Sequence, residues 1–311
     1  MRNTFINNLT ELASHDESIF LVVGDLGYGV VEIFENKFPS RFLNAGIAEQ
    51  NMIGLSAGLA KSGYKVFVYS IANFPTLRCL EQIRNDVCYG DLDVTIVSVG
   101  AGFSYGVLGY SHFAIEDISI MRTLPGIKIL SPSDPVEVKS AVKYALNNPG
   151  PKYLRLGKNG EPIIHQTDDV NLGSPIEIQN GSEYCLLVTG SIATEALLAV
   201  KKFNEEFNID VAIFSIPIIS TDLLSEFKFN EFSKIFTLEE HVASGGFGSF
   251  IAEFIVDNQI SVDLTRIFIS TKSIKLIGDQ AYLRKVSGID FTSIFNVLKS
   301  KIIDVETNLD S

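Results

Sequence analysis

The sequence is poor in cysteine and in basic side chains. Its three cysteines are an odd number, and none stands at CxxC spacing, which argues against a disulfide framework and a cysteine zinc site. Lys and Arg number 25 against 37 Asp and Glu, which gives a formal charge of −12. Because an acidic chain repels phosphate backbones, nucleic acid is disfavoured as a partner.

Long apolar runs and a dinucleotide fingerprint are also missing. No run reaches the roughly 18 apolar residues of a membrane helix. The polar first residues, MRNTFINNLTELASHDES, lack the apolar centre of a signal peptide, so we expect a cytoplasmic protein without a membrane segment. The turn GDLGYGV at 24–30 lacks the G-x-G-x-x-G spacing, which disfavours a nicotinamide-dependent oxidoreductase.

The chain does contain the alternating pattern of an α/β protein. Short apolar runs alternate with amphipathic stretches over 311 residues, which predicts about two domains with mostly parallel sheets. In the first half, the expected strands are 19–23, 65–69, 94–99, 127–130 and 153–156, and the expected helices are 48–61, 76–87 and 135–147.

A polar stretch punctuated by Gly and Pro divides the two halves. We expect a first domain at residues 1–160, a linker at 161–182 and a second, smaller α/β domain at 183–311. In the second domain, the expected strands are 184–189, 211–216, 234–238 and 266–270, and the expected helices are 193–207 and 248–258.

The most informative motif is RFLNAGIAEQNMIGLSAGL at 41–59. A short strand is expected to end at Asn44, and a helix rich in small residues begins near Glu49. Ligand sites in open α/β sheets lie at the carboxyl ends of strands, where this motif places the carboxylate. A carboxylate at a helix start also complements the helix dipole, so Glu49 alone does not establish a site.

Two further motifs follow expected strands. SIANFPTLRCLEQIRND at 70–86 places Phe74 in a loop, where its ring is either a core side chain or a stacking surface. GFSYGVLGYSHFAIED at 102–117 is a glycine-rich loop with Ser111 and His112, followed by an acidic pair. A single histidine is more often structural, but this setting favours a functional one.

Together these motifs resemble the pyrimidine-binding domain of transketolases. Asn-Ala-Gly-Ile-Ala-Glu-Gln is similar to the family's G-I-x-E signature, and the loop with His112 is similar to its G-x-D-G-P-T-H-Q-P-x-E segment. LEEHVASGGFGS at 238–249 resembles a turn of the family's carboxy-terminal domain, where His241 either faces a subunit interface or lies at the surface.

The resemblance implies a thiamine diphosphate site. In the family, the glutamate at the position of Glu49 hydrogen-bonds the aminopyrimidine ring and favours its imino tautomer, whose nitrogen takes the proton of the thiazolium carbon. Phe74 matches the stacking ring, Ile71 stands where a second aromatic is common, and Tyr69 is the alternative stacking residue. Asp25 matches an aspartate beside the cofactor, and a turn residue is the alternative interpretation.

The same resemblance assigns substrate contacts. His112, with Ser111 beside it, matches the histidine that stabilises the donor carbonyl oxygen or shuttles its proton. Arg2 and Arg155 match arginines that bind the sugar phosphate in the family, and a guanidinium suits phosphate geometry. The alternative is that the two are solvated surface cations.

Some family features are replaced or missing. Leu108 stands where transketolases place an acid that binds a substrate hydroxyl, and Gly100 stands at a phosphate-contact position. We expect either a different acceptor or a contact from elsewhere. The family's diphosphate and metal motif, Gly-Asp-Gly followed by paired asparagines, is absent; Gly278-Asp279-Gln280 does not match it.

The sequence therefore predicts the carboxy-terminal subunit of a split transketolase. We expect an amino-terminal partner subunit that binds the diphosphate and Mg²⁺, an α₂β₂ assembly, and transfer of a two-carbon ketol unit between sugars or sugar phosphates.

Two other interpretations stay open. One is the beta subunit of a 2-oxoacid dehydrogenase or a deoxyxylulose-phosphate-synthase-like carboligase; the other is a non-catalytic interaction subunit. Ser111 and His112 with Glu116 favour transketolase, and Glu49 and Phe74 favour catalysis.

Overall fold

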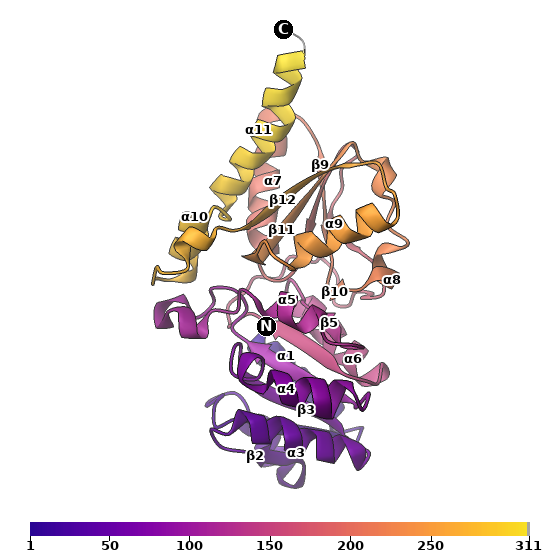
Figure 1. Cartoon of the computed structure of the whole chain (residues 1–311), viewed down its shortest axis with the longest axis vertical. Helices are drawn as coiled ribbons and strands as arrows, with labels where there is room; N and C mark the ends of the chain where they lie inside the picture. Colours follow the sequence, from indigo (N-terminus) through magenta and orange to yellow (C-terminus); the bar gives the residue numbers. More distant parts are fainter. Residues whose placement is uncertain (310–311) are drawn as a thin grey trace.

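In the computed structural model, which describes residues 1–309, the chain forms two α/β domains placed end to end (Figure 1). Within those residues, the first sheet has the order β10-β5-β6-β4-β3-β1-β2, and the second has the order β12-β11-β8-β9-β7. The strands pair in parallel except in β10–β5 and β7–β9. The predicted two-domain α/β fold with mostly parallel sheets is confirmed.

The first domain alternates strands and helices along the chain. Its strands are β1 (Ile19–Val23), β2 (Phe42–Asn44), β3 (Lys65–Ile71), β4 (Val94–Val99), β5 (Lys128–Leu130) and β6 (Lys152–Leu156). Its helices are α1 (Arg2–Leu12), α2 (Glu32–Lys37), α3 (Glu49–Lys61), α4 (Leu80–Gln82), α5 (Asp117–Arg122) and α6 (Pro135–Asn147).

The second domain follows the same plan. Its strands are β7 (Ile176–Gln179), β8 (Tyr184–Val188), β9 (Val211–Ser215), β11 (Lys234–Val242) and β12 (Asp263–Ile269), and β10 (Ile218–Ile219) pairs back with β5 of the first sheet. Its helices are α7 (Ala193–Phe207), α8 (Thr221–Leu224), α9 (Phe247–Asp257), α10 (Gln280–Ser287) and α11 (Phe291–Leu309). β7 lies inside the stretch expected to be a linker.

Local sequence explains most of these elements. β1 is a continuous apolar run, β4 is apolar or β-branched except at Ser98, and every residue in both is buried, as expected for strands covered on both faces. α6 begins where predicted, because Asp134 accepts a hydrogen bond from the backbone nitrogen of Glu137 and Pro135 occupies the first turn. The helix expected at 76–87 is instead a 3₁₀ turn, the short α4 and a π-helix in succession.

Buried charges join the two domains. Glu240 at the end of β11 accepts hydrogen bonds from the backbone nitrogen of Phe103 (3.0 Å) and from Arg284 (2.7 Å). The second domain therefore holds the loop that follows β4.

In the described part of the chain, no helix combines the length and apolar character needed to cross a bilayer.

Candidate active site

The predicted site residues lie on loops after four neighbouring strands. Asp25 follows β1, Glu49 follows β2, Phe74 follows β3 and His112 follows β4. These strands are adjacent and parallel, so their carboxyl ends share one edge of the first sheet. The last three residues form one line of contacts, with Arg78 between Glu49 and Phe74.

Glu49 is the first residue of α3, and its carboxylate is almost covered. Gly46, in a left-handed conformation with φ +73°, turns the chain from β2 towards the helix. The Glu49 side chain is 7% exposed, and its Oε1 accepts a 3.0 Å hydrogen bond from Nη1 of Arg78. The carboxylate thus lies between the amino terminus of α3 and the guanidinium of Arg78.

The ring of Phe74 lies under the same guanidinium. Cζ of Arg78 is 4.0 Å from the ring centroid, a cation–π contact. The rings of Phe74 and His112 meet edge to face, with centroids 5.3 Å apart. Thr76 fixes this loop, because its buried hydroxyl donates a 2.9 Å hydrogen bond to the carbonyl of Ala72. Phe74 is thus half-buried at the edge of the sheet, with its ring against the guanidinium of Arg78.

His112 is held by the loop that carries it. Its Nδ1 is 3.0 Å from Oγ of Ser111, which is exposed. The side-chain amide of Asn73 donates to the carbonyls of Ser111 and Phe113, which joins the Phe74 loop to the His112 loop. The structure therefore brings Glu49, Phe74 and His112 together, as the sequence predicts.

A cavity of about 470 Å³ opens beside the carboxylate. It is lined by Ile47, Ala48, Glu49, Gln50, Asn51 and Arg78. Its wall combines a nearly buried hydrogen-bond acceptor with a flat cationic group that rests on an aromatic ring. The carboxylate and the aromatic ring of this wall are the groups that suit a planar nitrogen heterocycle that donates a hydrogen bond.

Asp25 lies at the same edge, among polar neighbours. Its backbone is left-handed (φ +53°), and its carboxylate accepts hydrogen bonds from Asn44 (3.0 Å) and Tyr28 (2.9 Å). These bonds, the one from Asn44 first, lower the pKa of Asp25. The aspartate is therefore held ionised, and part of its surface faces solvent.

The stacking role considered for Tyr69 is wrong. Tyr69 is 1% exposed in the core, and its ring stacks on Phe5 with centroids 6.1 Å apart. Burial raises its pKa above the usual range of the phenol. Ile71 ends β3 and is half-buried, close to the Phe74 loop in sequence.

The predicted substrate contact of Arg155 is also not supported. Its side chain is 3% exposed, and its Nε donates to Oδ2 of Asp117 at 2.7 Å. Its Nη2 donates to the carbonyls of Ala114 and Glu240, at 2.8 and 3.1 Å. A substrate phosphate cannot reach this guanidinium without breaking a buried ion pair, so Arg155 is a structural residue at the domain junction.

Arg2, the other predicted phosphate contact, begins α1 beside Tyr105. It is half-buried, and its Nε is buried without a hydrogen-bond partner. Tyr105 also explains Gly100, because a Cβ at position 100 would lie 2.3 Å from the tyrosine ring and Gly100 has φ +108°. Leu108 is 53% exposed, so an apolar side chain faces outwards on the loop that carries His112.

His241 lies neither at the surface nor at an open interface. It is fully buried between Asp117 and Glu239, and burial lowers its pKa to about 4. Glu239 accepts hydrogen bonds from the first backbone nitrogens of α9, and burial raises its pKa to about 7. The motif at 238–249 therefore caps a helix and joins the domains.

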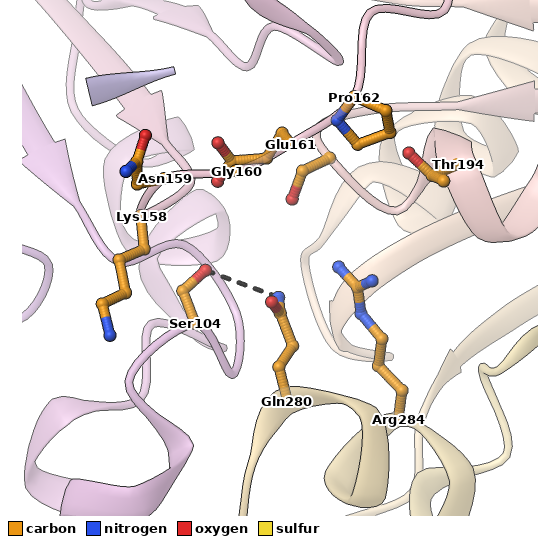
Figure 2. Close-up of a pocket in the computed structure, with 10 residues that line it drawn as sticks. Ser104, Lys158, Asn159, Gly160, Glu161, Pro162, Thr194, Gln280 and Arg284 are labelled. Atoms are coloured by element: carbon orange, nitrogen blue, oxygen red, sulfur yellow. Dashed lines mark hydrogen bonds between the residues drawn. The ribbon is translucent and has the colours of Figure 1, made fainter. Parts of the chain in front are cut away.

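A second hollow, which sequence reasoning missed, lies at the domain junction (Figure 2). It is lined by Ser104, Lys158, Asn159, Gly160, Glu161, Pro162, Ser191, Thr194, Gln280 and Arg284. Arg284 already pairs with Glu240 and Glu195, so its positive charge is compensated within the protein. Sequence reasoning also missed Arg78. Its position four residues after Phe74 could have placed it at the same loop.

Metal ligands are not gathered at either hollow. Among the described residues, no group of three or more His, Cys, Asp or Glu side chains is placed to hold a metal ion.

Both domains match known family models. The model of the transketolase pyrimidine-binding domain matches residues 1–161, and the model of the transketolase C-terminal domain matches residues 175–294. The B subunit of the apulose-4-phosphate transketolase of Actinobacillus succinogenes is 35% identical over 86% of this chain and 86% of its own length. The protein of the same name from Phocaeicola vulgatus is 33% identical over 84% of this chain and 85% of its own length.

One solved structure is similar over nearly the whole length. It is described as a split-gene transketolase in an inactive β4 tetramer. It superposes with a TM-score of 0.83 at 29% identity and covers 96% of both chains.

Proposed function

This chain belongs to the transketolase family, and we propose that it is the carboxy-terminal subunit of a split, thiamine-diphosphate-dependent transketolase. The observation that carries the proposal is the line of Glu49, Phe74 and His112 at one edge of the first sheet. A carboxylate, an aromatic face and an imidazole there suit a cofactor whose reactive ring is bound beside a sugar.

The residues fit the aminopyrimidine end of thiamine diphosphate. Glu49 has a nearly buried oxygen that can hold the ring nitrogen, and Phe74 offers a face for stacking. When bound, thiamine diphosphate would supply a carbon nucleophile and an electron sink for breaking a bond next to a carbonyl. Glu49 would hold the proton shared with the ring nitrogen, and Phe74 would keep the ring flat against the sheet edge.

His112 serves the substrate side in this proposal. Ser111 holds Nδ1 of the imidazole at 3.0 Å, which leaves Nε2 to face the donor's carbonyl or hydroxyl oxygen. The edge-to-face contact of the His112 and Phe74 rings, with centroids 5.3 Å apart, supports a position of the imidazole beside a ring stacked on Phe74. A histidine in this position moves or holds a proton at the substrate oxygen.

The diphosphate and Mg²⁺ are assigned to a partner chain. This chain lacks the Gly-Asp-Gly and paired-asparagine motif, and the described residues offer no group of metal ligands. The solved relative described as an inactive β4 tetramer is consistent with a subunit that needs a companion. We propose an α₂β₂ assembly in the cytoplasm, with the cofactor between the two kinds of subunit.

The proposed reaction moves a two-carbon ketol unit from a ketose donor to an aldose acceptor. The relatives from Actinobacillus succinogenes and Phocaeicola vulgatus are named for a phosphorylated sugar, and we extend to this chain the reaction type and the use of sugar phosphates. Because Leu108 is apolar and exposed, we propose that the acceptor or the partner subunit contacts it through an apolar group.

Reconstitution tests the proposal. The chain is mixed with its partner subunit, thiamine diphosphate and Mg²⁺, and ketose consumption is measured with an aldose acceptor. Glu49→Gln removes the ionisable carboxylate and is expected to reduce the rate by about 10²–10⁴-fold. Glu205→Gln, at an exposed site on α7, is the matched control and should leave the rate unchanged.

The alternatives predict other outcomes. Consumption of pyruvate in place of ketose would identify a dehydrogenase or synthase-like subunit. Cofactor-independent partner binding without turnover would identify an interaction subunit. An unaffected rate in Glu49→Gln would reject the assignment of the carboxylate.

A further inference from the structure

Arg78 makes the two contacts that a bound aminopyrimidine ring would need. Its planar guanidinium donates a hydrogen bond to Glu49 at 3.0 Å and lies near the face of Phe74, with Cζ 4.0 Å from the ring centroid. A heterocycle held by the same carboxylate and the same aromatic face cannot share that space. We propose that Arg78 occupies the place of the cofactor ring in the unloaded chain and is displaced when the ring binds.

The side chain is free enough to move. It is 48% exposed, while its partner Glu49 is 7% exposed. Within the described residues, the guanidinium has no hydrogen bond other than the one to Glu49. The backbone stays in place because the amide of Gln50 donates a 3.0 Å hydrogen bond to the carbonyl of Arg78. Displacement therefore requires rotation of one arginine side chain and no change in the loop.

The exchange gives Arg78 a function in both states. In the unloaded chain, Arg78 neutralises the nearly buried carboxylate of Glu49. Without Arg78 that carboxylate would be unpaired, and burying an unpaired charge costs free energy. When the ring replaces the guanidinium, the cation leaves and the ring nitrogen becomes the nearest partner of Glu49. Arg78 thus sets the affinity for the cofactor by competing with it.

This inference rests on the proposed function and is tested by equilibrium binding. Thiamine diphosphate is titrated calorimetrically into the reconstituted complex with Mg²⁺, using unmodified chain, Arg78→Ala and Arg78→Lys. Arg78→Ala removes one half-exposed ion pair and one cation–π contact, so its cofactor should bind about three- to tenfold tighter. Arg78→Lys keeps the charge but not the flat face, and should bind with intermediate affinity.

Arg84→Ala is the matched control. Arg84 is exposed a few residues further on and donates only to the adjacent Asn85 at 2.8 Å, so its loss should leave cofactor affinity unchanged. Equal or weaker cofactor binding in Arg78→Ala would overturn the inference and make Arg78 a support of the bound ring. Absence of cofactor binding in the unmodified complex would instead overturn the proposed function, and this inference with it.

Discussion

The ion pair of Arg155 and Asp117 tests whether Arg155 stabilises the fold, as its burial indicates, or binds the substrate. Both side chains are nearly inaccessible, at 3% and 0% exposure, and Nε lies 2.7 Å from Oδ2. The hydroxyl of Tyr153 donates to the same oxygen at 2.7 Å. Arg155→Met leaves the carboxylate of Asp117 buried without its cation.

The expected magnitude follows from that burial. Removing one partner of a buried pair costs about 3–5 kcal/mol, because the remaining charge has no compensation. For a domain of 150–250 residues, 1 kcal/mol shifts Tm by about 2–4 °C, so Tm should fall by roughly 6–20 °C. The double variant Asp117→Asn with Arg155→Met should lose less than the sum of the two single variants.

The assay is thermal unfolding followed by far-UV circular dichroism, with Arg84→Met as an exposed control. Ketose kinetics of the reconstituted enzyme are measured on the same samples below the transition. A fall in Tm with an unchanged KM in the surviving enzyme supports a structural role. An unchanged Tm with a raised KM for a phosphorylated ketose would refute it and return Arg155 to the substrate site.

Three further predictions concern the loops and the junction. Gly100→Ala should lower Tm and reduce ketol transfer, because the new Cβ would meet the ring of Tyr105 at 2.3 Å in a left-handed backbone; a neutral effect in both assays would contradict this packing. Burial opposes ionisation of His165, but the carboxylates of Asp134, 3.0 Å from Nδ1, and Glu137, 3.3 Å from Nε2, raise its pKa above 6.5. The stabilisation by protonated His165 is therefore present below pH 6.5 and is lost as pH rises through the folded-state pKa. The urea midpoint of the unmodified chain should fall as pH rises above 6.5, and His165→Gln should make that fall smaller. Identical pH profiles of the two proteins would exclude this contribution. Glu240→Leu should speed proteolysis of the loop after β4, measured by limited digestion, because that loop loses its buried acceptor at 3.0 Å; an unchanged cleavage rate would show that other contacts hold the loop.

Much of the fold is predictable because its signals are local. Asp134 and Pro135 alone are enough to place the start of α6 where the structure has it. The apolar runs of β1 and β4 predict both strands. β7 and β10 escape prediction, because short edge strands form only when another strand of the finished sheet offers hydrogen bonds.

The candidate site is partly predictable for a similar reason. Parallel strands bring their carboxyl ends to one edge, so Glu49, Phe74 and His112 can be placed together from their positions after strands. The burial of Arg155 and Tyr69 cannot be seen in the sequence, because it depends on packing between domains and on which face of a strand points inwards. The role of Arg78 depends on a tertiary contact, which a sequence pattern does not give.

The most direct test of the proposed cofactor site is a crystal structure of the complete assembly with thiamine diphosphate. We predict an oxygen of Glu49 at about 2.6–3.2 Å from a ring nitrogen of the aminopyrimidine, with the ring stacked on Phe74 and the Arg78 side chain turned away. A ring bound elsewhere, with the Glu49–Arg78 pair still in place, would contradict this site.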